Sequence, residues 1–258
     1  MIGGPRRPRG FSIKPRGAAF KRAADTAGYE EFDPLTRVNL GRSVETALLS
    51  RPFTEFNALH PFWGSGIYAI YFTGSASHPI YGRIAGHPSP VYVGRAVPKG
   101  ARKGLIEVEE GKRSRVLCDR LYHHWESIDQ AQNLATEDFS CRWLVADMLF
   151  VPMAEQLMIQ TYRPVWNLVI DGFGNNDPGG RRYDQDRSRW DTLHPGRRWA
   201  PQLADPPYTS GDLRRQLLAH LDAHPPEMAP TVPPILHGPA VVAIPESDED
   251  EPDEILDE

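Results

Sequence analysis

The hydrophobic pattern between residues 66 and 95 is typical of two paired β-strands. Residues 66–72 (GIYAIYF) and 90–95 (PVYVGR) are both dense in β-branched and aromatic side chains. The connection between them is rich in Gly and Pro, so we expect the two runs to form an antiparallel pair. Residues 141–147 (CRWLVAD) alternate well enough to predict a third strand.

Helical spacing appears on either side of the third expected strand. Between residues 114 and 128, apolar residues recur at roughly helical intervals, and Ser114 is a candidate N-cap. Arg120 and His124 are four positions apart there, so they share one helix face. Pro152 and Pro164 bound a second helix, with Glu155 expected in its first turn.

Two further helices are expected outside this central region. A short one over residues 43–49 ends before Pro52, and another is possible over residues 212–223. We therefore expect a flexible basic arm at residues 1–32, a folded domain at residues 33–203, and a Pro-rich, acidic, mostly disordered tail at residues 204–258.

The uneven distribution of charge indicates a polyanion binder. The formal net charge is -5, from 29 basic and 34 acidic residues. All 29 basic residues lie at or before Arg215, whereas 11 of the acids follow it, which leaves about +6 on residues 1–215. The acidic tail is most simply a solubilising segment, and the alternative is that it competes with the bound polyanion for the basic surface.

Cysteine use and hydropathy favour a soluble cytoplasmic protein. Cys118 and Cys141 form no CxxC pair and stand among apolar residues, as reduced buried thiols do. No run approaches the ~18 apolar residues of a membrane span, and no apolar stretch typical of a signal peptide follows the basic N-terminus.

The two strand runs carry a paired motif that resembles the GIY-YIG nuclease superfamily. Gly66-Ile67-Tyr68 and Tyr92-Val93-Gly94 are followed by Arg120 in a helix, a strand, Glu155 in a helix, and then Asn167. Residues 39–41 (NLG), the Arg120/His124 pair and residues 172–175 (GFGN) extend the resemblance over about residues 33–200, to the restriction endonucleases that cut CCGCGG.

This resemblance implies an α+β fold with a small central three-stranded antiparallel sheet flanked by helices. It also implies one bound divalent ion, Mg²⁺ or Mn²⁺, and a homodimer on double-stranded DNA. The chain departs from many superfamily members at Arg95, where they have Lys, and in the long stretch between Gly94 and Arg120.

The expected chemistry is hydrolysis of a phosphodiester bond. Glu155 would hold the metal, because a hard carboxylate oxygen suits Mg²⁺. Tyr68 would accept the proton of the attacking water, assisted by Tyr92 and His124, while Arg120 stabilises the phosphorane and Asn167 holds a phosphate. Each residue also has a structural alternative. A first-turn Glu complements a helix dipole, strand tyrosines pack cores, Arg and His occupy solvated helix faces, and Asn caps turns.

Basic side chains of residues 96–115 and 172–199 are expected to contact DNA, although a solvated loop is the alternative for such charge runs. Arginine is the usual bidentate partner of guanine, so an arginine-rich surface suits a G·C-rich site. The candidate DNA-binding residues are Arg95, Lys99, Arg102, Lys103, Arg113, Arg115, Asn175, Arg181, Arg182, Arg187 and Arg189.

The sequence therefore predicts a type II restriction endonuclease that cuts a short palindromic site as a homodimer, paired with a methyltransferase of the same specificity. A structure-specific or homing nuclease is one alternative, although no separate DNA-binding module is evident. A catalytically inactive DNA-binding protein is the other.

Overall fold

The computed structural model of the chain describes residues 37–98 and 114–225. The expected basic arm, the part of the tail after residue 225, and four candidate DNA contacts (Lys99, Arg102, Lys103 and Arg113) lie outside the described residues.

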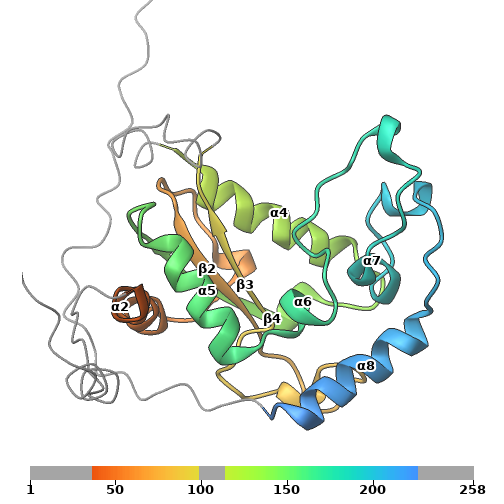
Figure 1. Cartoon of the computed structure of the whole chain (residues 1–258), viewed down its shortest axis with the longest axis horizontal. Coiled ribbons are helices and arrows are strands. Elements are labelled where there is room, and N and C mark those ends of the chain that lie inside the picture. The colour runs from red at the N-terminus through yellow and green to blue at the C-terminus, as the bar shows by residue number, and fades with distance from the viewer. Residues whose placement is uncertain (1–36, 99–113, 226–258) are drawn as a thin grey trace, which may run out of the picture. The chain divides into compact units, whose positions relative to one another are not determined.

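An antiparallel sheet forms the centre of the fold (Figure 1). Its order is β1-β4-β2-β3, with β1 at Thr54–Glu55, β2 at Gly66–Phe72, β3 at Tyr92–Ala96 and β4 at Phe139–Val145. The expected pairing of the first two runs is confirmed, with Tyr68 opposite Gly94, and the third strand pairs with β2. The sheet has one strand more than expected because two-residue β1 is too short to show alternation.

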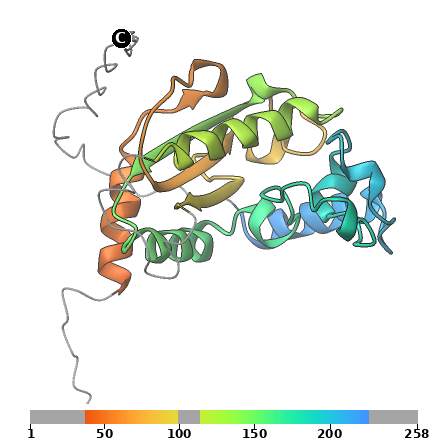
Figure 2. The ribbon, with the colours of Figure 1, turned by 90° about the horizontal axis from the view of Figure 1, so that it is seen from above.

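Helices cover both faces of the sheet, as Figure 2 shows. Alternate residues of β2 pack against α2 (Arg37–Leu49) and α5 (Val151–Tyr162) on one face. The others, including Tyr68, pack on the face covered by α4 (Val116–Gln130). Burial on both sides explains why β2 is apolar throughout rather than alternating with polar residues.

The remaining elements lie outside the sheet, and several of them add buried residues to the core on the α4 face. These are α6 (Val165–Leu168), α7 (Arg189–Leu193), α8 (Ser210–Ala223) and short 3₁₀ turns at Phe56–Ala58, Gly82–Ile84, Thr136–Asp138, Gly180–Arg182 and Ala200–Gln202. Trp166, Phe173 and Trp190 meet in this core.

Helix α8 matches the helix that was possible over residues 212–223, and it packs on the core. Thr209 and Asp212 form a capping box at its start, and Leu213 and Leu217 are fully buried in the core on the α4 face. Buried leucines spaced four apart anchor one helix face. Residues 210–223 therefore belong to the folded core.

Three smaller expectations can be compared with the structure. Helix α2 begins at Arg37, six residues before the expected start. Helix α5 begins at Val151 and has no acid in its first turn, so the expected placement of Glu155 in that turn was wrong. Cys118 and Cys141 are buried free thiols, as expected. Within residues 37–98 and 114–225, no helix is long and apolar enough to cross a membrane.

Candidate active site

The two motif glycines each leave room for a close neighbour, which is a backbone carbonyl at Gly66 and the Tyr68 side chain at Gly94. A β-carbon at Gly66 would lie 2.0 Å from the carbonyl oxygen of Leu144 on β4. One at Gly94 would lie 2.4 Å from the hydroxyl oxygen of Tyr68. Any larger residue at position 94 would therefore displace the Tyr68 ring, which lies over the neighbouring strand.

The hydroxyl of Tyr68 is bonded to a histidine in the interior. It lies 2.6 Å from Nε2 of His124, and the side chains of both residues are almost fully buried. Burial raises the pKa of Tyr68 well above its usual value; Tyr92 adds to this and Arg120 opposes it. Burial, followed by the positive charge of Arg120, lowers the pKa of His124 well below its usual value. At neutral pH the pair is therefore a neutral phenol and a neutral imidazole.

Tyr92 and Arg120 converge on the same place. The Tyr92 ring lies 6.1 Å from that of Tyr68 and 5.3 Å from that of His124, measured between centroids. A β-carbon at Gly174 would lie 2.8 Å from both Arg120 Nη2 and the Tyr92 hydroxyl oxygen. Arg120 donates to the carbonyl oxygen of Gly174 at 2.6 Å. The expected grouping of two tyrosines, one histidine and one arginine is thus present in the structure.

Glu155 reaches the site across the edge strand β3. Its Oε2 atom lies 2.9 Å from Nε of Arg95, and about a quarter of each side chain is exposed (24% and 25%). Glu155 lies close enough to Tyr92 to raise the pKa of that tyrosine, after the larger effect of burial. Arg95, expected to contact DNA, instead pairs with the expected metal ligand.

Asn167 bonds the backbone of the edge strand β3. Its Oδ1 accepts from the Val93 amide and its Nδ2 donates to the Val93 carbonyl, both at 2.8 Å. The side chain therefore bonds the outer edge of β3 as a neighbouring strand would. These two bonds give Asn167 a structural role at β3 and use one of its two N–H donors; the expectation that Asn167 holds a phosphate stays a prediction.

The arginines of residues 172–199 separate into two groups. Arg187 bonds the carbonyl of Ala200 and pairs with Asp205, and Arg189 bonds the carbonyl of Val169. These two partly exposed side chains thus make bonds within the protein, and their expected contact with DNA stays a prediction.

Arg115, Asn175 and Arg182, three further candidates for DNA contact, are exposed. Arg115 forms a 3.6 Å ion pair with Asp119 at the start of α4. Asn175 and Arg182 line a polar cavity beside Trp199. The backbone of Arg181 lies in the same 3₁₀ turn as that of Arg182. These positions remain candidates for contact with a polyanion.

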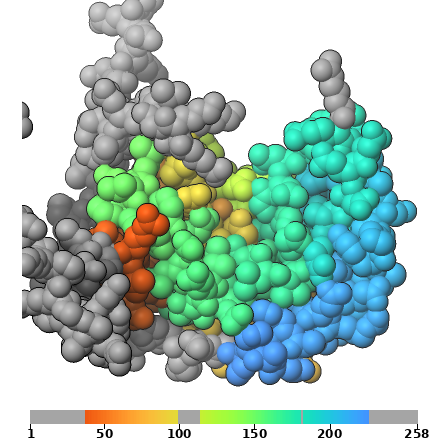
Figure 3. Space-filling model, viewed as in Figure 1, coloured from red at the N-terminus to blue at the C-terminus, as the bar shows by residue number. Residues whose placement is uncertain are grey.

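Figure 3 shows a hollow between α5 and the loop segment that follows α6, with residues of β3 and α4 at its base. The site therefore lies where the sheet edge, α4 and this loop segment meet.

One organising residue was missed by the sequence analysis. Arg197 is 2% exposed and pairs with Asp191, which is 1% exposed. Nothing in the sequence separates Arg197 from its exposed neighbour Arg198.

The fold and the grouping around Tyr68 and Tyr92 define a GIY-YIG nuclease. A family model described as the Eco29kI GIY-YIG domain matches residues 60–221, well over half of the chain. The chain belongs to this family, which is a family of restriction endonucleases. The match ends within α8, in agreement with the burial of that helix. A search of curated proteins found no match for the chain.

Proposed function

We propose that the protein is a type II restriction endonuclease that makes Mg²⁺-dependent double-strand cuts at a short palindromic, G·C-rich site similar to CCGCGG. The observation that carries this proposal is the 2.6 Å bond between the Tyr68 hydroxyl and His124 Nε2, next to Tyr92 and Arg120. The bonded pair supplies a proton acceptor, Nε2 of His124, next to the positive charge of Arg120.

Tyr68 acts as a relay for the proton of the attacking water. Because burial keeps its phenol protonated, it accepts a proton only as it passes its own to His124 Nε2. Nε2 of His124 is unprotonated and available, because burial and Arg120 hold the pKa of His124 low. The same low pKa makes the imidazole a weak base, so it takes the proton only in concert with attack of the water on the phosphate. The result is a neutral Tyr68, an imidazolium at His124 and a hydroxide bonded to the phosphorus. The P–O3′ bond then breaks, and the departing 3′ oxygen takes up a proton from solvent.

Arg120 stabilises the charge that develops on the phosphate oxygens. Its Nη2 donates to Gly174 and its Nη1 lies 3.4 Å from Asn176 Oδ1, which holds the guanidinium in one orientation. A guanidinium has five N–H donors, so this arrangement leaves others to bond phosphate oxygens. Such preorganised donors commonly contribute ~10²–10³ to a rate.

Glu155 is the residue that would hold Mg²⁺. The donor fits, because Mg²⁺ commonly binds one or two carboxylates and completes its shell with water and phosphate oxygens. The side chain is partly exposed and lies near Tyr92. When bound, the ion would supply charge neutralisation at the scissile phosphate. Arg95 orients the carboxylate through its ion pair.

Asn167 is a positioning residue in this scheme. Its two bonds hold β3, and with it Tyr92, against α6. Asn175, Arg115, Arg181 and Arg182 are proposed to contact DNA. Two copies of the chain would act on the two strands of a palindrome, because a two-fold dimer matches its symmetry. A methyltransferase of the same specificity would protect host DNA in the cytoplasm.

The decisive experiment is a plasmid digest with Mg²⁺ in which the fragment ends are sequenced. We expect discrete fragments, no cleavage in EDTA, and protection of DNA methylated at the site. Tyr68→Phe should abolish cleavage with little loss of DNA binding. Tyr71→Phe is the matched control, because Tyr71 lies on the opposite face of the same strand, in the core with α2 and α5.

Other results would favour other functions. Nicking of branched substrates would indicate a structure-specific nuclease, and a gel shift without cutting would indicate a binding protein. A monomeric mass on specific DNA would refute the dimer. Undiminished turnover by Tyr68→Phe would remove this residue from the mechanism.

A further inference from the structure

Arg197 is buried, and a carboxylate and two tryptophan rings contact its guanidinium. Its Nε donates to Asp191 Oδ1 at 2.7 Å, and its guanidinium lies 4.4 Å from the ring centroid of Trp190 and 4.8 Å from that of Trp199. Asp191 is itself bonded by the Ser188 hydroxyl at 2.6 Å. A buried ion pair is retained only where further hydrogen bonds satisfy both partners.

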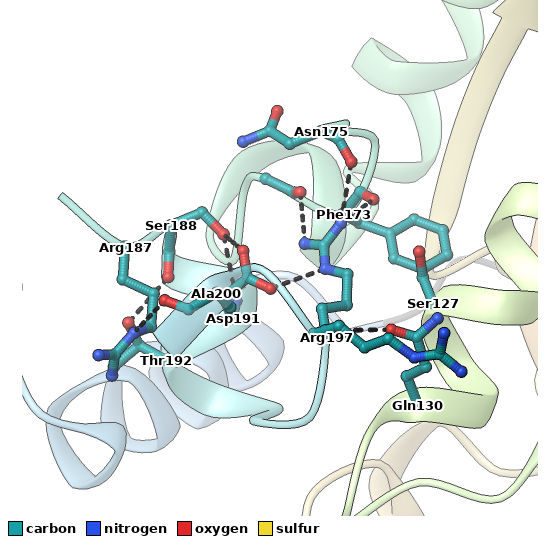
Figure 4. Close-up of polar contacts among 12 residues, drawn as sticks. Ser127, Gln130, Phe173, Asn175, Arg187, Ser188, Asp191, Thr192, Arg197 and Ala200 are labelled. Carbon is teal, nitrogen blue, oxygen red and sulfur yellow. Dashed lines mark hydrogen bonds and ion pairs between the residues drawn. The ribbon is translucent and has the colours of Figure 1, made fainter. Parts of the chain in front are cut away.

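The remaining donors of Arg197 hold the backbone of one loop. Nη1 donates to the carbonyl oxygens of Phe173 at 3.2 Å and Asn175 at 3.0 Å, and Nη2 donates to that of Gly172 at 2.9 Å. Figure 4 shows the guanidinium between Asp191 and these carbonyl groups. The planar guanidinium of arginine can donate to the Asp191 carboxylate on one side and to the loop carbonyls on another. A lysine ammonium is a single point of charge and lacks this arrangement of donors.

The loop held in this way forms one wall of the catalytic site. The Phe173 ring is stacked on His124, 4.4 Å between centroids and 15° between planes, and packs edge-on against Tyr92 at 5.1 Å. The next carbonyl, that of Gly174, is the one that accepts from Arg120. Contacts thus run from Asp191 through Arg197 and the loop to His124 and Arg120.

We propose that Arg197, oriented by Asp191, is a positioning residue for DNA cleavage. It holds the loop of residues 172–175, so that Gly174 places Arg120 and Phe173 places His124. The proposal rests on the nuclease function proposed above. Arg197 itself is too deeply buried to contact DNA. Its effect reaches the reaction through Arg120 and His124, and a small misplacement of such groups can slow catalysis by ~10²-fold.

The test is the single-turnover cleavage rate at saturating DNA and Mg²⁺, measured for Arg197→Met and the milder Arg197→Lys. We expect a fall of about 10²-fold for Met and a smaller fall for Lys, which keeps the charge and loses the fork. Leu217→Ala is the control for lost stability, because Leu217 is fully buried in α8. It should lower Tm and leave the rate unchanged at a temperature well below the transition.

A double-mutant cycle with Arg120→Ala separates positioning from a general structural role. If Arg197 acts largely through Arg120, Arg197→Met should add less than about 10-fold to the loss already caused by Arg120→Ala. Independent, multiplied losses would overturn the proposal, as would a wild-type rate for Arg197→Met. Failure of both the wild type and Leu217→Ala to cut DNA would overturn the nuclease function itself, and this inference with it.

Discussion

A buried histidine away from the site should make the fold sensitive to acid. His194 is fully buried, with Nε2 at 2.6 Å from the Tyr81 hydroxyl and Nδ1 at 2.9 Å from Asn133 Oδ1. The Trp166 indole donates to the Tyr81 oxygen at 2.7 Å, so Tyr81 donates its own proton to Nε2. Nδ1 then carries the one ring proton. This chain of bonds accommodates only the neutral imidazole.

The size of the effect follows from proton linkage. Burial lowers the pKa of His194 from 6.5 to about 3 in the folded state. The unfolded chain therefore binds a proton more readily between these values, and the stabilising effect of His194, complete above pH 6.5, declines as the pH falls. From pH 7 to pH 5 the loss is about 2 kcal/mol. This corresponds to about 4–8 °C in Tm for a domain of this size.

The assay is urea unfolding at pH 7 and pH 5 for the wild type and His194→Gln, which lacks the titrating group. The difference in unfolding free energy between the two pH values should be about 2 kcal/mol smaller in the variant. Exposed His60 provides the control, and His60→Gln should behave as the wild type. If the unfolding free energies of the wild type and His194→Gln change equally between pH 7 and pH 5, the reasoning is refuted, whatever the absolute stabilities of the two proteins.

Three further predictions concern the site. Gly94→Ala should slow cleavage at least ~10²-fold while circular dichroism stays unchanged, because the new methyl would lie 2.4 Å from the Tyr68 hydroxyl oxygen. Asn167→Leu should cost about 2 kcal/mol in urea unfolding, since two backbone groups of β3 lose their partners. Glu155→Gln should abolish cleavage at every Mg²⁺ concentration yet change stability by less than about 1 kcal/mol, its ion pair being partly exposed. Residual cleavage by Glu155→Gln that rises with Mg²⁺ concentration would contradict the prediction for this variant.

The sequence was sufficient for features that depend on local pattern. The strand runs around Tyr68 and Tyr92 were predicted because both are dense in β-branched and aromatic residues. The helix carrying Arg120 and His124 was predicted from its apolar spacing. Residues four apart necessarily share a helix face, so the approach of these two side chains to one site was also predictable.

Tertiary structure alone decided the roles of residues whose partners are distant in the chain. Asn167 bonds Val93 on the edge of the sheet, 74 positions away, and no local pattern marks that contact. Helix α8 has an ordinary amphipathic sequence, and only the core shows that Leu213 and Leu217 are buried. Arg197 and Arg198 are identical in sequence terms, yet one is enclosed between two tryptophans and the other is exposed. Periodicity specifies which face of an element is apolar, whereas the partner of a polar side chain depends on how separate elements come together.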